Sequence, residues 1–224
     1  TRISPFTGGS RFIQENLLTP HEAKIIGITL FILVIVGGLI LSYLSTFKLI
    51  GVGIVGIILG WSYSANPIKL MSRGIWGELA ITSCWALIVV GSSLIRHETL
   101  SVNAVLLGLS YGLIISNILL VNQLPDVPAD TLASKKTLAV EVGANHVWKW
   151  FLTFLISAYV ILVGGFLLGI FEKSILISVL ALPIAIKTAA HLRKNYADRK
   201  SLTTSIKETI LFSHLFGCLL LISL

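Results

Sequence analysis

Seven long apolar runs constrain this 224-residue chain more than any other feature. A helix needs about 20 apolar residues to cross the hydrocarbon core of a bilayer. The runs reach or nearly reach that length, and they cover residues 25–44, 49–66, 75–95, 102–122, 148–170, 174–190 and 205–224. None shows the strict alternation of a membrane β-strand. The sequence therefore predicts an all-α, polytopic transmembrane helix bundle with seven spans.

The composition excludes the main alternatives. Hydrophobic residues make up 55% of the chain and charged residues 12%, whereas about 25% of a soluble domain is charged. The mean hydropathy of +0.92 also excludes disorder, whose signature is low hydrophobicity. Two cysteines cannot form a disulfide framework. An integral membrane protein remains.

The basic residues predict the orientation of the spans. With seven spans, 14 of the 17 Lys and Arg residues fall on the side of the N-terminus and 3 on the other side. Because Lys and Arg collect in cytoplasmic loops, the N-terminus is predicted to be cytoplasmic and the C-terminus external. The same rule explains the net charge of +7, so no nucleic-acid partner is predicted.

One polar segment, residues 117–140, has the residue types of a metal site. Asn122, Asp126 and Asp130 are spaced four apart, which places them on one face of a helix with a drift of about 40° per step. Two carboxylates and an amide suit Mg²⁺, which completes its coordination shell with water and substrate phosphates. The array therefore predicts a diphosphate held through Mg²⁺.

The surroundings of this array place it at the membrane edge. Pro125 and Pro128 kink or end a helix, so the motif is expected where the fourth span meets a cytoplasmic loop. Lys135 and Lys136 follow and can neutralise phosphate oxygens. The alternative interpretation is a solvated loop whose lysines only obey the positive-inside rule.

Two further polar segments lie on the same side. Residues 63–79 include Tyr63, Lys69, Arg73 and Glu78; Lys69 can reach a diphosphate or be an ordinary loop lysine, and Glu78 can be a helix N-terminal charge. Near the N-terminus, Arg11 can bind phosphate or anchor the membrane interface.

Glycines inside the spans have a packing interpretation. Residues 51–56 match a dinucleotide-binding pattern, but they lie within a span and lack its strand and acidic partner. We therefore expect Gly53, Gly56 and Gly60 to let helices approach closely, and Gly165 and Gly169 to do the same.

Together these segments resemble the UbiA superfamily of intramembrane prenyltransferases. Residues 122–143, NQLPDVPADTLASKKTLAVEVG, resemble its second Asp-rich motif, N-x-x-P-D-x-x-A-D followed by G-K-R-T-L-x-V-x-x-G. Residues 63–79 are similar to its tyrosine-lysine and Gly-Glu region, and residues 4–20 resemble a stretch found in the branch related to menaquinone biosynthesis. Thr131 and Ser134 depart from the usual Arg or Lys and Gly of the motif.

The resemblance implies nine spans, with a first Asp-rich motif after the second. On that basis the chain is expected to be a single integral-membrane prenyltransferase-like domain, residues 1–224, that lacks the first two spans and one carboxylate set. It also implies a bacterial cytoplasmic (inner) membrane as the location.

The resemblance further implies Mg²⁺-dependent transfer of a polyprenyl group from polyprenyl diphosphate to an aromatic acceptor, 1,4-dihydroxy-2-naphthoate in the related branch. It assigns catalytic roles to Asp126, Asp130, Lys69 and Tyr63, the first two with Asn122 as metal ligands. Substrate contacts are expected from Asn122, Lys135, Lys136, Arg11 and Arg73. Two alternatives stay open: a superfamily member with a 4-hydroxybenzoate, chlorophyllide, haem or lipid acceptor, and a non-catalytic seven-span transporter or scaffold.

Overall fold

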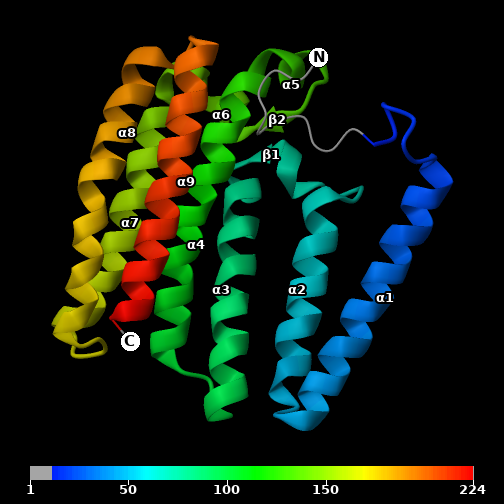
Figure 1. Cartoon of the computed structure of the whole chain (residues 1–224), viewed down its shortest axis with the longest axis vertical. Coiled ribbons are helices and arrows are strands. Elements are labelled where there is room, and N and C mark those ends of the chain that lie inside the picture. Colours follow the sequence, from blue (N-terminus) through cyan, green and yellow to red (C-terminus); the bar gives the residue numbers. More distant parts are fainter. Residues whose placement is uncertain (1–11, 224) are drawn as a thin grey trace.

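The computed structural model describes residues 12–223, and these residues form a bundle of long helices side by side (Figure 1). The long helices are α1 (Pro20–Leu44), α2 (Lys48–Ser64), α3 (Ile75–His97), α4 (Val102–Gln123), α7 (Val147–Leu167), α8 (Leu182–Asn195) and α9 (Arg199–Ile222). Short elements connect them: the 3₁₀ helices η1 (Leu70–Ser72), η2 (Leu124–Asp126), η3 (Ala144–His146) and η4 (Lys173–Ala181), the helices α5 (Val127–Leu132) and α6 (Leu138–Val142), and the strands β1 (Arg73–Gly74) and β2 (Lys136–Thr137).

The helical fold class is confirmed, and the number of spans differs by one from the prediction. Six helical segments of the described chain are long and apolar enough to cross a membrane. The run at 49–66 forms α2, whose 17 residues span only about 25 Å. This helix ends at Ser64, because Ala65 is extended. Pro67 then disfavours helical backbone at Asn66, the residue before it.

Several predicted helix ends also move. The first helix begins at Pro20 rather than residue 25, because Thr19 and Glu22 form a reciprocal capping box there. The run at 174–190 begins as the 3₁₀ helix η4 and continues as α8 to Asn195. The last helix begins at Arg199 rather than at residue 205, because the Asp198 side chain caps its first turn.

The closest helix contact joins α3 and α4. Small residues recur at every fourth position on the buried face of α4: Ala104, Gly108, Gly112 and Ser116. A Cβ added at Gly108 would lie 2.8 Å from Ala86 Cα, and one at Gly112 would lie 2.9 Å from Thr82 Cα. The backbones of α3 and α4 therefore touch, as small residues allow in membrane bundles.

Hydrogen bonds between helices complete this contact. The Thr82 and Ser116 hydroxyls are 2.8 Å apart, and Ser116 Oγ donates to the Glu78 carbonyl at 2.9 Å. On the other face of α4, Ser110 Oγ donates to the Ala158 carbonyl of α7 at 3.1 Å. Such bonds satisfy polar groups where lipid offers no partner.

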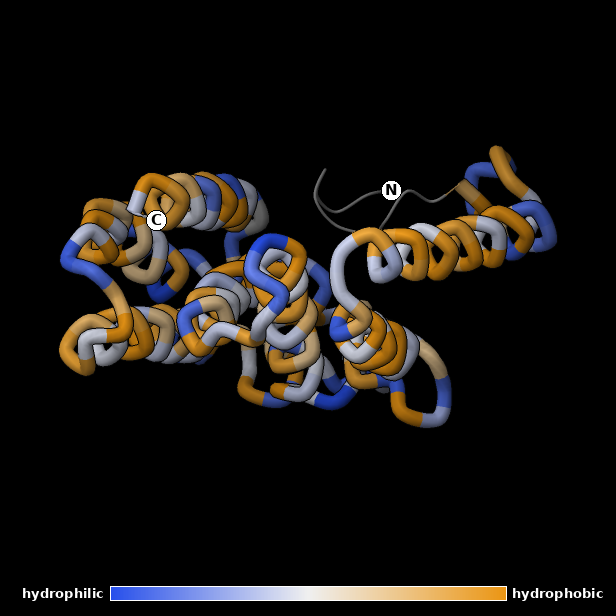
Figure 2. The backbone as a smooth tube through the Cα atoms, turned by 90° about the horizontal axis from the view of Figure 1, so that it is seen from below, coloured by the Kyte–Doolittle hydropathy of each residue, from blue (hydrophilic) through white to orange (hydrophobic). Residues whose placement is uncertain are grey.

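The buried core lies among α4, α7 and α9, where large aromatic residues such as Phe151, Phe212 and Phe216 are fully enclosed. In contrast, α1 lies at one edge of the bundle, and Ser42 is its one buried residue. Viewed from below relative to Figure 1, the helices are coloured mostly as apolar (Figure 2). This distribution suits a protein surrounded by lipid.

The packing role predicted for the glycines of α2 is wrong within the described residues. No atom lies within 4 Å of a Cβ added at Gly53, Gly56 or Gly60. Gly165 does allow a close approach, because an added Cβ would overlap the Phe171 ring, whereas Gly169 meets nothing and instead adopts a positive φ of 72° in the turn after α7.

The α3–α4 contact predicts that Gly112→Ala lowers the free energy of unfolding by about 1–3 kcal/mol, because the new methyl group overpacks against Thr82. Unfolding by SDS, followed by circular dichroism, measures this. Gly164→Ala in α7 is the matched control, since nothing lies within 4 Å of its Cβ, and its helix propensity gain is at most about 1 kcal/mol. Equal stability of the two variants would contradict the close contact.

Candidate functional site

Two short parallel strands join the two polar segments that sequence analysis placed on one side. β1 pairs with β2 so that Arg73 is opposite Lys136 and Gly74 is opposite Thr137. The strands lie at one end of the bundle, where α2 and α4 end and α3 begins (Figure 1). Residues 63–79 and 117–140 therefore contribute to one polar region rather than to two separate loops.

A glycine allows this junction to close. Gly74 has a φ of 52°, and the Glu141 carboxylate of α6 lies where its Cβ would be. Any side chain at position 74 would push Glu141 away and also strain the backbone. The Gly74–Glu141 contact thus connects the start of α3 to the element that follows the Asp-rich segment.

The Asp-rich segment is helical but not one regular helix. Asn122 lies in the last turn of α4, Asp126 ends the 3₁₀ turn η2, and Asp130 lies in α5. Pro125 and Pro128 are each the second residue of a new helical element, where a backbone N–H has no intrahelical partner to lose. The prolines thus divide the predicted single helix into consecutive short helical elements, and residues 122–130 stay helical.

Asp130 and Lys135 form an ion pair at the end of this segment. Lys135 Nζ lies 3.3 Å from Asp130 Oδ1, and the Lys135 backbone N–H donates to the Asp130 carbonyl at 2.8 Å. Asp126 interacts electrostatically with both residues. Ser134 makes the turn between them with a φ of 55°, which explains why glycine is usual at this position of the motif.

Asn122 has an incomplete set of contacts. Its Oδ1 atom is buried and has no hydrogen-bond partner among the described residues. A buried acceptor without a donor is costly, and in a set with two carboxylates such an oxygen suits a hard cation. The described residues contain no group of three or more His, Cys, Asp or Glu side chains that could hold a metal ion, so a metal site in this segment needs the Asn122 amide beside Asp126 and Asp130.

The predicted basic residues that the structure describes lie at the same end of the bundle. Arg73 and Lys136 are exposed and line a pocket of about 450 Å³ with Ser72, Trp76 and Glu141. Arg73 is oriented by donation from Nη2 to the Pro67 carbonyl at 2.9 Å. Lys69 is exposed in the turn before η1. Arg11 lies outside the described residues, so its predicted role stays a prediction.

Tyr63 and Glu78 mark the inner boundary of the site. Tyr63 is half-buried in α2 and interacts electrostatically with Glu78. Glu78 lies in the first turn of α3, as expected for a helix N-terminal charge, yet it is only 1% exposed. Its environment is therefore the protein interior rather than water.

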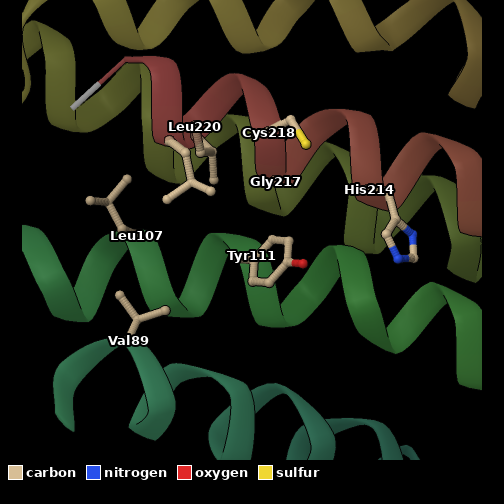
Figure 3. Close-up of a pocket in the computed structure, with 8 residues that line it drawn as sticks. Val89, Leu107, Tyr111, His214, Gly217, Cys218 and Leu220 are labelled. Atoms are coloured by element: carbon tan, nitrogen blue, oxygen red, sulfur yellow. The ribbon is translucent and has the colours of Figure 1, made fainter. Parts of the chain in front are cut away.

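An apolar pocket of about 280 Å³ lies deeper in the bundle, between α3, α4 and α9 (Figure 3). Val89, Leu107 and Leu220 line its apolar part, and Tyr111 projects toward α9. Gly217 lets α9 pass close to the Tyr111 ring, since an added Cβ would lie 3.0 Å from it. The pocket can accommodate a hydrocarbon chain.

Sequence reasoning missed Gln123, Ser72 and Glu141. Gln123 stands inside the Asp-rich motif, and a polar residue beside a predicted ligand was a usable signal. Ser72 and Glu141 carry no pattern of their own, and only the pairing of β1 with β2 places them in the pocket.

Fold and site together define an integral-membrane helical protein whose acidic and basic side chains gather at one end of the bundle. Comparison with known proteins then specifies the group: the model of the UbiA prenyltransferase family matches residues 7–216, so the chain belongs to this family. No solved structure matches the chain significantly.

The similar curated proteins carry consistent names. The 1,4-dihydroxy-2-naphthoate octaprenyltransferase of Mycobacterium leprae is 27% identical over 90% of this chain and 67% of its own length. The Bacillus subtilis protein of the same name is 23% identical over 80% of the chain and 58% of its own length. A UbiA prenyltransferase domain-containing protein 1 of Dictyostelium discoideum is 31% identical over 63% of the chain and 45% of its length. The chain thus spans about two thirds or less of these relatives and resembles the menaquinone-pathway branch.

The Gly74–Glu141 contact predicts that Gly74→Ala loosens the segment between α4 and α7. A side chain at position 74 displaces Glu141 and separates β1 from β2, so limited proteolysis of membranes should cut residues 124–143 faster. Gly169→Ala is the control, because it has a similar positive φ of 72° but no atom within 4 Å. Equal cleavage of residues 124–143 in both variants would show that the contact is unimportant.

Proposed function

We propose that the complete protein transfers a polyprenyl group from polyprenyl diphosphate to an aromatic acceptor, 1,4-dihydroxy-2-naphthoate, with the help of Mg²⁺. The observation that carries this proposal is the pairing of β1 with β2, which joins the segment of Lys69 and Arg73 to the segment of Asp126, Asp130 and Lys135 at one end of the bundle. Family membership and the names of the similar proteins support the reaction and the acceptor.

The residues present fit a magnesium-diphosphate complex. Asn122, Asp126 and Asp130 supply oxygen ligands, and the buried Asn122 Oδ1 lacks any other partner among the described residues. When bound, Mg²⁺ would neutralise the diphosphate and stabilise it as a leaving group. Lys135 is already beside Asp130, where its ammonium group can balance the charge of the departing diphosphate.

The other predicted site residues and an apolar pocket can bind the diphosphate, the acceptor and the prenyl chain. Lys69, Arg73 and Lys136 place exposed cations at the same end of the bundle, where they can hold diphosphate oxygens or the carboxylate of an aromatic acid. Tyr63 is a candidate for contact with the acceptor. The apolar pocket beside Leu107 and Tyr111 can hold a part of the prenyl chain that lies away from the diphosphate.

We further propose that these loops face the cytoplasm of a bacterial inner membrane. The 14:3 distribution of Lys and Arg, counted with the shorter helix α2 as a seventh crossing, supports this orientation. The orientation gives a soluble aromatic acid access to the site. The proposed acceptor is tested first, by assaying prenyl transfer to 4-hydroxybenzoate and to 1,4-dihydroxy-2-naphthoate side by side.

Asp126→Asn is expected to lower kcat/KM for prenyl transfer by about 100-fold or more, because it removes a negative ligand from the metal-diphosphate site. Membrane insertion should be unchanged. Asp198→Asn is the matched control, since this exposed residue caps α9 and asparagine caps equally well. Asp198 is also an ionised acid, because hydrogen bonds from Ser201 keep its pKa below the usual range. Near-normal activity of Asp126→Asn would overturn the metal assignment.

Lys69→Ala is expected to raise KM for polyprenyl diphosphate about tenfold with little change in kcat, because an exposed cation contributes to ground-state binding and transition state alike. Steady-state kinetics with varied donor measures this effect. Lys173→Ala, at the opposite end of the bundle, should leave KM unchanged. An unaltered donor dependence in Lys69→Ala would remove Lys69 from the site.

A further inference from the structure

Glu78 is a buried acid that the proposed reaction does not use. Its side chain is 1% exposed in the first turn of α3, and no Lys, Arg or His of the described residues forms an ion pair with it. Its Oε2 atom is buried and without a hydrogen-bond partner in the same part of the chain. Burying a carboxyl group without a cation is costly, so its place in the interior calls for a compensating role.

The partner of Glu78 is Gln123, the last residue of α4. Gln123 Nε2 donates to Glu78 Oε1 at 2.6 Å, and Gln123 Oε1 accepts from the Ala139 backbone N–H at 3.0 Å. The Ala139 N–H can only donate, so it fixes the Gln123 amide with its oxygen toward Ala139 and its NH₂ toward Glu78. One side chain thus bridges α3 and α6.

This bridge holds both ends of the Asp-rich segment. Gln123 is the residue before η2, and η2 ends at Asp126. Ala139 is the second residue of α6, which follows β2. Between them lie Asp130 and Lys135, the pair described above. The backbone of Glu78 is fixed as well, because Ser116 Oγ of α4 donates to its carbonyl at 2.9 Å.

We propose that Glu78 is a positioning residue for prenyl transfer: through Gln123 it fixes the segment that carries Asp126, Asp130 and Lys135 in the geometry that binds the metal-diphosphate. This inference rests on the proposed function, but its structural part concerns only Glu78 and residues 123–139. It is distinct from a role in proton transfer, because Glu78 acts through the orientation of an amide and not through the loss or gain of a proton.

Hydrogen–deuterium exchange of the complete protein tests the structural part. In Glu78→Ala and in Gln123→Ala, amides of residues 136–142 should exchange about tenfold faster, since the hydrogen-bonded bridge that holds Ala139 is lost. The double variant should be no faster than either single variant, because both remove the same bridge. Glu78→Gln should exchange like the wild type, since its amide oxygen still accepts from Gln123.

Glu208→Ala is the matched control, because Glu208 is another largely buried acid but pairs with Lys187 between α8 and α9. It should leave exchange at 136–142 unchanged. Gln123→Ala removes no charge and stays informative should Glu78→Ala fold poorly. Unchanged exchange at 136–142 in Gln123→Ala would overturn the proposal.

The Mg²⁺ concentration for half-maximal prenyl transfer tests the functional part. It should rise about tenfold in Glu78→Ala and Gln123→Ala and stay within about twofold in Glu78→Gln, because only the first two release the ligand-bearing segment. A Glu78→Gln variant as impaired as Glu78→Ala would overturn the positioning role and indicate proton transfer. A wild-type protein without transferase activity would overturn the proposed function, while the exchange result would still decide whether the bridge exists.

Discussion

The backbone contact between α3 and α4 is the constraint on which the rest of the structure depends. Gly108 and Gly112 bring the two helices so close that a methyl group would collide with Ala86 or Thr82. Dispersion and interhelical hydrogen bonds favour such contacts in lipid, where hydrophobic association is weak. Because α3 begins and α4 ends at the same end of the bundle, this packing puts Glu78 and Gln123 within hydrogen-bond distance.

From that fixed pair the polar end of the bundle is assembled by short-range interactions. The 3₁₀ turn η2 continues α4 to Asp126, and α5 returns the chain to β2, which pairs with β1 at the start of α3. No long loop is needed. Asp126 in η2 and Asp130 in α5 therefore lie at the same end of the bundle as Lys69, which precedes η1, and Arg73 of β1. A multiply charged anion bound there has cations available from both segments, since Lys135 and Lys136 follow α5.

Sequence patterns predicted the helices and the acidic segment but not how they meet. Apolar runs locate spans well because a membrane demands them, and the 122–143 motif identified the family later matched over residues 7–216. The glycine pattern alone does not reveal whether a neighbouring helix is close: a Cβ added at Gly53 or Gly56 would meet no neighbouring atom within 4 Å in the described residues, whereas one at Gly108 or Gly112 would collide with the α3 backbone. The pairing of β1 with β2 covers two residues on each strand, which is too short to produce a recognisable sequence pattern. The burial of Glu78 depends on this pairing and on the packing of α3 against α4.

Product analysis tests the central claim most directly. Membranes with the complete protein would be given a polyprenyl diphosphate and 1,4-dihydroxy-2-naphthoate, with Mg²⁺ or with EDTA, and the products separated by chromatography and mass spectrometry. The account predicts a prenylated naphthalene product and stoichiometric diphosphate release with Mg²⁺, and neither with EDTA. Equal product in EDTA, or no prenylated product with any aromatic acceptor, would contradict it.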